Sequence, residues 1–160
     1  AASDVYKRQE YTIFKNEEGV KSKSFNIGTI RLRDNLVKKG VKEEMDEWLK
    51  EMGKKYHPEL VIGSGGNINK LFKMSGLPSM KIMKNAKIKQ LKEFLESHSL
   101  EDRIEKLGLR PDRADVIIPA AELFLNTLKQ AKVSGVLVPK VGLADGIIHQ
   151  LYQEYKLDQK

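Results

Sequence analysis

The sequence predicts an α/β fold in which a mixed sheet is flanked by helices. Short β-prone runs are separated by longer runs whose apolar residues recur every three or four positions, which is the spacing of amphipathic helices. Strands separated by helices favour helices packed on the faces of one sheet. The 160 residues, 40% of them hydrophobic, are enough for one ordinary core and one domain.

The first elements are a predicted β-hairpin and two helices. Residues 10–14 and 20–26 are β-prone, and the turn sequence "KNEEG" joins them. A short helix is expected after Gly28. An amphipathic helix is expected over residues 41–55, with Trp48 in its buried stripe, so this tryptophan is predicted to be a core residue.

The middle of the chain predicts a buried strand at residues 60–62, a glycine-rich loop and three helices. Asn67 is expected to cap the first helix, which extends to residue 74. Apolar residues at helical spacing mark a second helix over residues 88–95. In "SLEDRIEKLG" a serine cap begins a third helix, and Gly108 closes it.

The last third contains the most apolar helix, expected over residues 115–131. Its sequence is apolar almost all round, as in a helix packed centrally against a sheet, and Pro119 should lie near its start or kink it. "GVLVPK" then predicts a buried strand. One stripe of the final helix contains Leu143, Ile147, Ile148, Leu151, Tyr152 and Tyr155.

Charge and composition limit the classes of function. The formal charge of +7 and the pI of about 9.4 favour anionic partners such as phosphate, polyphosphate, nucleotides or nucleic acid, although most lysines are expected on solvated helix faces. The chain has no cysteine, which excludes disulfides, cysteine nucleophiles and thiolate metal sites. Three separated histidines do not predict a metal site. A soluble, cytoplasmic protein is expected.

The glycine-rich loop is the main candidate site. Gly63, Ser64, Gly65 and Gly66 follow a predicted strand and precede a helix that opens at Asn67. Unpaired backbone N–H groups at a helix start suit a phosphate, although the spacing matches neither the P-loop nor G-x-G-x-x-G. The residues alone leave two interpretations open: an anion-binding loop, or a tight turn without a ligand.

A weaker version of the same arrangement occurs earlier in the chain. Gly28 and Thr29 precede Arg31, whose guanidinium can bind a phosphate with two hydrogen bonds. The alternative is that Arg31 is a salt-bridge partner. No residues are placed by sequence as a nucleophile and base, so no catalytic residue is predicted.

Charged residues around the apolar helix are expected to have structural roles. Glu122 is a candidate for a raised pKa, but is more readily explained by a place at an edge of the helix or by pairing with Arg110 or Arg113. Arg113 and Asp115 lie on either side of a predicted helix start, where capping is the simpler interpretation of the aspartate.

Four segments together resemble the exopolyphosphatase and guanosine pentaphosphate phosphatase (Ppx-GppA) family in order and spacing. The resemblance covers about residues 10 to 155. The segments are "SFNIGTIRL", "VIGSGGNINKL", "LRPDRADVIIPAAELFL" and "VPKVGLADGIIHQLY".

The resemblance implies an actin-like ATPase, ribonuclease H-like fold and a division of the chain. Residues 10–160 look like the C-terminal half, domain II, of a two-domain enzyme that lacks its first central strand, so the piece is expected to be marginally stable. Residues 1–9, "AASDVYKRQ", resemble translated adapter sequence. Glu10 then matches the last residue of the family's D-x-G-G-G-S-x-E loop and is the one metal ligand implied.

The resemblance also implies an activity for the intact protein: release of terminal phosphate from inorganic polyphosphate or guanosine pentaphosphate, with Mg²⁺ or Mn²⁺. The catalytic glutamate belongs to the other domain, so this piece is expected to be inactive alone. Its expected partners are the phosphorylated substrate, the missing domain and a second copy in a homodimer. The implied phosphate-binding residues are Gly28, Thr29, Arg31, Gly63, Ser64, Gly65, Gly66 and Asn67.

Two observations qualify this interpretation. Ala144 and Asp145 stand where the family often has an arginine and a glutamate, which favours polyphosphate over a guanine nucleotide. The charge of +7 also fits a different class of function, a non-catalytic domain that binds nucleic acid or polyphosphate.

Overall fold

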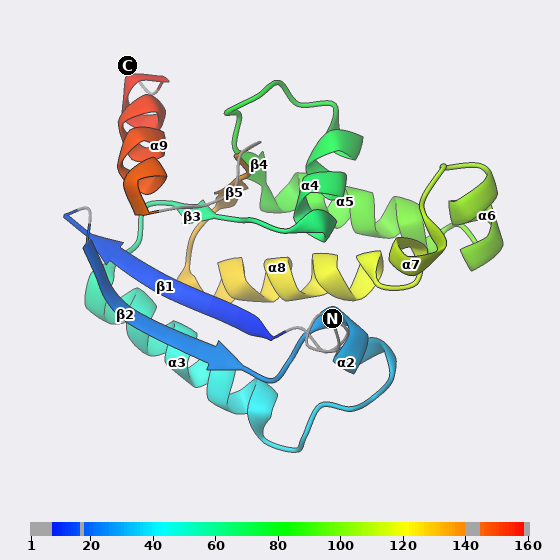
Figure 1. The fold of residues 1–160 in the computed structure, drawn as a ribbon, viewed down its shortest axis with the longest axis horizontal. Coiled ribbons are helices and arrows are strands. Elements are labelled where there is room, and N and C mark those ends of the chain that lie inside the picture. The colour runs from blue at the N-terminus through cyan, green and yellow to red at the C-terminus, as the bar shows by residue number, and fades with distance from the viewer. Residues whose placement is uncertain (1–7, 17, 140–144, 159–160) are drawn as a thin grey trace.

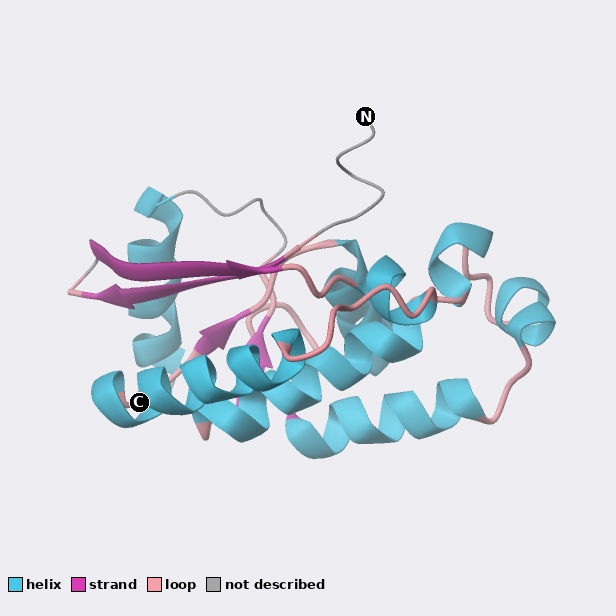
Figure 2. Cartoon of the chain, turned by 90° about the horizontal axis from the view of Figure 1, so that it is seen from below, coloured by secondary structure: helices cyan, strands magenta, loops and turns pink. Residues whose placement is uncertain are grey.

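The computed structural model describes residues 8–16, 18–139 and 145–158, and within them the strands form two separate sheets. β1 (Gln9–Lys15) and β2 (Glu18–Phe25) form an antiparallel hairpin. β5 (Gly135–Leu137) lies between β3 (Val61–Ile62), which is parallel to it, and β4 (Met83–Lys84), which is antiparallel. Figure 2 separates the long hairpin strands from these short ones. The mixed sheet expected from the sequence is present, but the hairpin forms a sheet of its own, so the described strands do not make the one sheet that was expected.

The helices are α2 (Thr29–Arg33), α3 (Val41–Tyr56), α4 (Gly66–Ser75), α5 (Asn85–Glu96), α6 (Leu100–Glu105), α7 (Pro111–Ala114), α8 (Ile117–Ala131) and α9 (Asp145–Asp158). Helices α4, α5, α8 and α9 lie around the short sheet, whereas α3 lies beyond α8, beneath the hairpin, and α6 and α7 lie at the far end of the molecule (Figure 1).

The ends of several elements follow local rules, and two elements were not predicted. The Ser99 side chain accepts a hydrogen bond from the Asp102 backbone N–H at 3.1 Å, as expected of the α6 cap. α6 ends before Gly108, which adopts a left-handed φ of 69° in the turn that follows. Pro119 lies in the first turn of α8, where its missing N–H costs no helical bond. The unpredicted elements, β4 and α7, are only two and four residues long.

α8 is the central helix, as its apolar sequence predicted. In Figure 1 it lies between α3 on one side and α4 and α5 on the other, and it packs against all three. Most of its buried residues belong to the larger apolar cluster, around α4, α5 and β5, whereas Leu123 belongs to a second cluster with α3 and the hairpin. α8 therefore joins both parts of the core.

The hairpin is held against α3 and α8 by aromatic packing. The rings of Tyr11 and Phe25 each lie about 6 Å from the ring of Trp48, which is 7% exposed. Trp48 is thus a core residue, as predicted, and truncating a side chain buried in this way costs about 3–5 kcal/mol. The Tyr11 hydroxyl also lies 2.7 Å from the Thr127 hydroxyl on α8.

Several predictions of the sequence lie outside the described residues. These are the departure at Ala144, the place of Leu143 in the α9 stripe, and residues 1–7 of the segment 1–9 assigned to adapter sequence, whose last residue, Gln9, begins β1. Leu151, from the same stripe, is buried. The hairpin and the three-stranded sheet do not pair with each other among the described residues, and the strand expected between them stays a prediction. No helix in the described residues has the length and apolar character needed to cross a membrane.

Burial raises the pKa of Tyr11 to about 12, from 10.0, and this predicts a pH-dependent stability. The phenol is neutral in the folded protein but ionises near pH 10 once unfolded. The contribution of Tyr11 to the free energy of unfolding is therefore complete below pH 10. It is lost as the pH rises to 12, by about 3 kcal/mol in total. Urea unfolding of the wild type and Tyr11→Phe across this range measures it. The free energy of unfolding of the wild type should fall relative to that of Tyr11→Phe as the pH rises. If the two free energies change in parallel with pH, Tyr11 is not the residue responsible.

Candidate functional site

The glycine-rich loop lies at the carboxyl end of β3, where the chain turns into α4. Its last ladder bond runs from the Gly63 N–H to the Leu137 carbonyl, at 2.9 Å. Ser64, Gly65 and Gly66 are exposed. The first helical bond of α4 is donated by the Asn69 N–H to the Gly65 carbonyl, and no side chain caps the helix. The earlier N–H groups of the helix are thus available to an acceptor from outside.

Two of the glycines have structural explanations. A Cβ on Gly63 would lie 2.9 Å from the Val136 side chain and 3.0 Å from Phe124, so its place is taken by core packing. Gly65 has φ +120° and ψ 165°, a conformation that L-residues rarely adopt, and it is the N-cap of α4. Both residues shape the loop without needing a ligand.

Gly66 is explained by a charged neighbour. A Cβ there would lie 2.5 Å from Nη2 of Arg113, so the guanidinium lies directly against the backbone at the start of α4. Nη1 of the same arginine donates a 2.8 Å hydrogen bond to Oδ1 of Asn67. The expectation that Asn67 caps α4 is therefore wrong: the N-cap is Gly65, and the Asn67 amide binds Arg113 instead.

The position of Arg113 has an electrostatic consequence. The amino end of a helix carries a partial positive charge, so a guanidinium beside it is unfavourable by itself. An anion at the same place would be attracted by both groups and could accept hydrogen bonds from both. The exposed loop, the start of α4 and Arg113 together therefore form a candidate site for an anion with several oxygens.

Sequence reasoning did not include Arg113 among the site residues. It lies 46 positions from Asn67 in the chain, so no local spacing connects the two. The only signal was the presence of Arg113 within one of the four family-like segments.

The other predicted stretch, Gly28 to Arg31, lies at the start of α2. Gly28 is buried and has φ −96°, an extended conformation that does not require glycine, whereas Thr29 and Arg31 are partly buried. α2 packs against α8. Arg33, at the end of α2, donates a 2.8 Å hydrogen bond to Oδ2 of Asp115, and hydrogen bonds to Asp34 and then Asp115 raise its pKa. Residues 113–115 thus contact α2 on one side and the glycine loop on the other.

The interpretation of Asp115 was wrong, whereas that of Glu122 is confirmed in part. Asp115 is the residue that ends α7, not a cap of the following helix, and its carboxylate pairs with Arg33 because the end of α2 lies beside it. Glu122 does reach the edge of α8, where its side chain is 56% exposed, but it pairs with Lys92 of α5 at 3.7 Å. The expected arginine partners are turned elsewhere: Arg113 to Asn67, and Arg110 to Asp112.

Glu10 lies on the outward face of β1. Its carboxylate accepts a hydrogen bond from the Ser24 hydroxyl at 3.3 Å and is exposed. A single carboxylate does not make a magnesium site, which needs several oxygen ligands around the ion. Within residues 8–16, 18–139 and 145–158 there is no group of three His, Asp or Glu side chains that could hold a metal. The metal role of Glu10 stays a prediction.

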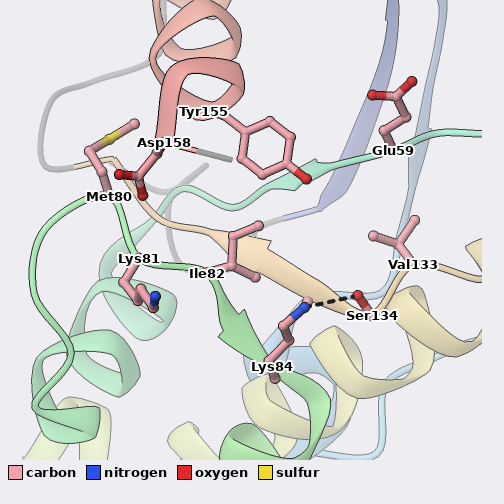
Figure 3. A pocket seen from close by; sticks show the side chains of 10 residues that line it. Glu59, Met80, Lys81, Ile82, Lys84, Val133, Ser134, Tyr155 and Asp158 are labelled. Carbon is pink, nitrogen blue, oxygen red and sulfur yellow. Dashed lines mark hydrogen bonds between the residues drawn. The ribbon is translucent and has the colours of Figure 1, made fainter. Parts of the chain in front are cut away.

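A hollow of about 220 Å³ lies elsewhere, beside α9 (Figure 3). Its lining includes Glu59, Lys84, Ser134 and Tyr155, and Lys84 Nζ lies 3.5 Å from the Ser134 hydroxyl. Tyr155 belongs to α9, whereas the other three residues come just before β3 and β5 or at β4, at the opposite end of the parallel pair from the glycine loop. Ligands of open α/β sheets bind at the carboxyl ends of the strands, so this hollow is not the expected place.

Alanine should destabilise the protein more at Gly63 and Gly65 than at Gly66. Gly63→Ala should cost about 1–3 kcal/mol because its Cβ meets packed side chains and the Val136 strand. Gly65→Ala should cost a similar amount through backbone strain. Gly66→Ala displaces only the flexible end of Arg113, so its cost should stay under about 1 kcal/mol. Urea unfolding checks the order, and a Gly66→Ala protein as unstable as Gly63→Ala would show that Arg113 is fixed by packing.

The fold is similar to solved Ppx/GppA structures. The Aquifex aeolicus PPX-GPPA enzyme is 21% identical and superposes with a TM-score of 0.67, covering 89% of this chain and 53% of its own. An exopolyphosphatase from Cytophaga hutchinsonii is 19% identical, with a TM-score of 0.67, covering 91% and 54%. An exopolyphosphatase-like protein is 15% identical, with a TM-score of 0.57.

Other comparisons give no match: no model of a known protein family fits the chain, and no curated protein matches its sequence. The chain spans about half the length of the structures that it resembles. The resemblance first seen in the four sequence segments is therefore also found in three dimensions, and the described residues have the α/β fold of about half of a Ppx/GppA protein.

Proposed function

We propose that this chain is part of a phosphoanhydride hydrolase that releases terminal phosphate from inorganic polyphosphate or guanosine pentaphosphate, and that the glycine loop binds one of the substrate's phosphate groups. The observation that carries the proposal is the guanidinium of Arg113 lying against Gly66, beside the uncapped start of α4. The similarity of fold to exopolyphosphatase structures supports the choice of reaction.

The role of the loop follows from its groups. Backbone N–H groups at the start of α4 and the Arg113 guanidinium beside them are hydrogen-bond donors, whereas a phosphate presents several acceptor oxygens. Phosphoryl transfer depends mainly on positioning and on stabilising negative charge on the phosphate oxygens. In the proposed enzyme the loop positions the phosphate and stabilises its negative charge. No described residue of this chain is proposed to activate water.

A divalent cation, Mg²⁺ or Mn²⁺, belongs to the proposed enzyme and would neutralise phosphate charge. Glu10 alone does not provide a site for it, so most of the ligands would come from residues outside those described. The carboxylate that activates water would likewise belong to the missing domain. Among substrates, polyphosphate is proposed first because Ala144 and Asp145 replace residues that the family often uses.

Arg113→Gln tests the phosphate site directly. Losing a charged hydrogen-bond donor should weaken binding of tripolyphosphate to the 160-residue chain about tenfold or more. Titration calorimetry at low salt measures the affinity. The matched control is Arg110→Gln, since Arg110 is 79% exposed, is paired with Asp112 and carries the same charge. Equal losses in the two variants would mean that only net charge matters.

The enzymatic proposal is tested by joining this chain to the rest of its protein. The joined protein should release phosphate from polyphosphate in the presence of Mg²⁺, whereas the 160-residue chain alone should release none. Phosphate release is measured by colorimetric assay with polyphosphate, guanosine pentaphosphate and other phosphoanhydrides in parallel. A joined, folded protein that hydrolyses none of them would overturn the proposed reaction.

A further inference from the structure

A second positively charged feature lies far from the glycine loop, at the carboxyl ends of α3 and α8. A hollow of about 490 Å³ is lined there by Lys50, Lys54, His57, Lys129 and Lys132, and we refer to it as the basic hollow. α3 and α8 run in the same direction, so their carboxyl ends meet at the same side of the molecule (Figure 1). The lining includes no carboxylate.

The lysines of the basic hollow differ from lysines elsewhere in their partners. On solvated faces, Lys23 pairs with Glu44 at 2.9 Å and Lys92 pairs with Glu96 at 3.0 Å. None of the four lysines in the basic hollow forms an ion pair within the described part of the chain. The hollow therefore concentrates uncompensated positive charge, which repels itself and attracts anions.

The two helices cannot move apart easily to relieve this repulsion. A Cβ on Gly53 would lie 3.1 Å from the Ala131 carbonyl oxygen and 3.3 Å from its Cα, so the backbones of α3 and α8 approach closely beside the hollow. The two helices also pack against each other, and Met52 of α3 shares one buried apolar cluster with Leu123 of α8. The core thus fixes the spacing of the lysines that project from the two helices.

The attraction of helix ends for cations explains only part of the cluster. Lys54 and Lys129 lie in last turns, where the helix dipole favours a positive charge. Lys50 lies earlier in α3, beyond the reach of that effect. His57 and Lys132 end the two helices in left-handed conformations, and their N–H groups bind the carbonyls of Gly53 and Leu128. The lysine side chains remain free for another ligand.

We propose that the basic hollow binds inorganic polyphosphate, as a second anion site separate from the glycine loop. The positive charge of the hollow does not depend on the proposed function, whereas the choice of polyphosphate as its ligand rests on that function. A polyphosphate chain carries charge on every unit, which suits closely spaced lysines on two sides. No Phe, Tyr or Trp lines the hollow, so it lacks the stacking platforms that single-stranded nucleic acids use.

The two sites are too far apart to bind the same phosphate group. Arg113 lies just before α8, and Lys129 and Lys132 lie at its end. α8 has 15 residues, which at 1.5 Å per residue gives a separation of about 22 Å. Substitutions in one site can therefore be made without touching the other.

The test uses a double variant, Lys50→Gln with Lys129→Gln, which removes one lysine from each helix. Its control is Lys73→Gln with Lys89→Gln. These two lysines are exposed on α4 and α5, outside the basic hollow, so the control removes the same charge elsewhere. Affinity for long-chain polyphosphate is measured by calorimetry at several salt concentrations. The hollow variant should bind at least tenfold more weakly, and its salt dependence should fall by about 2 in slope. The control should change less than about threefold.

Circular dichroism first shows that the variants are folded. Each of the other possible results then either supports or overturns the proposed polyphosphate site. Equal losses in the two double variants would mean non-specific attraction and would overturn the inference. A loss in Arg113→Gln but none in the hollow variant would overturn it too, while leaving the glycine loop as the phosphate site. A loss in the hollow variant with none in Arg113→Gln supports the hollow and contradicts the loop. Binding of single-stranded oligothymidylate as tight as that of polyphosphate would overturn the choice of ligand.

Discussion

The burial of α8 between two apolar clusters is the constraint on which the rest of the structure depends. α4, α5 and β5 pack on one side of the helix, whereas α3 and the hairpin pack on the other. Glycines stand where other parts of the chain lie close to α8: Gly63 against the side chain of Phe124, and Gly53 against the backbone of Ala131 at the end of the helix. Both candidate anion sites are placed by this helix, since Arg113 precedes it and Lys129 lies in its last turn.

One polar contact crosses this apolar arrangement. The Thr127 hydroxyl donates to the Leu123 carbonyl at 2.8 Å, so it accepts the hydrogen bond from the Tyr11 hydroxyl. Burial keeps the Tyr11 phenol in the neutral form that can donate, because its pKa is raised to about 12. This directional hydrogen bond attaches the hairpin to α8, in addition to the aromatic packing against Trp48.

The sequence predicted the features that depend on local or periodic signals. The apolar periodicity of α3 and α8, the burial of Trp48 and the Ser99 cap are all present in the structure. β4 and α7 were missed because two and four residues carry no periodic signal.

The candidate site was predicted only in part, for a different reason. The run of glycines identified the loop, but the expectation that Asn67 caps α4 was wrong, because its amide binds Arg113. Gly63 also makes room for the core, a contact that the sequence did not reveal. These contacts join residues from distant parts of the chain, as do the lysines of the basic hollow, which come from two helices. Only the tertiary packing brings such groups together, so no local pattern could have revealed them.

The length of α8 has a consequence for any polymer that binds both of its ends. A ligand shorter than the helix, about 22 Å, can be held at only one end, whereas a longer chain can be held at both at once. For the longer chain, release of one end leaves it tethered at the other, where rebinding is favoured by high effective concentration. Such a protein would retain long chains and let short ones go, and the number of helical turns between its two ends would set the boundary between them.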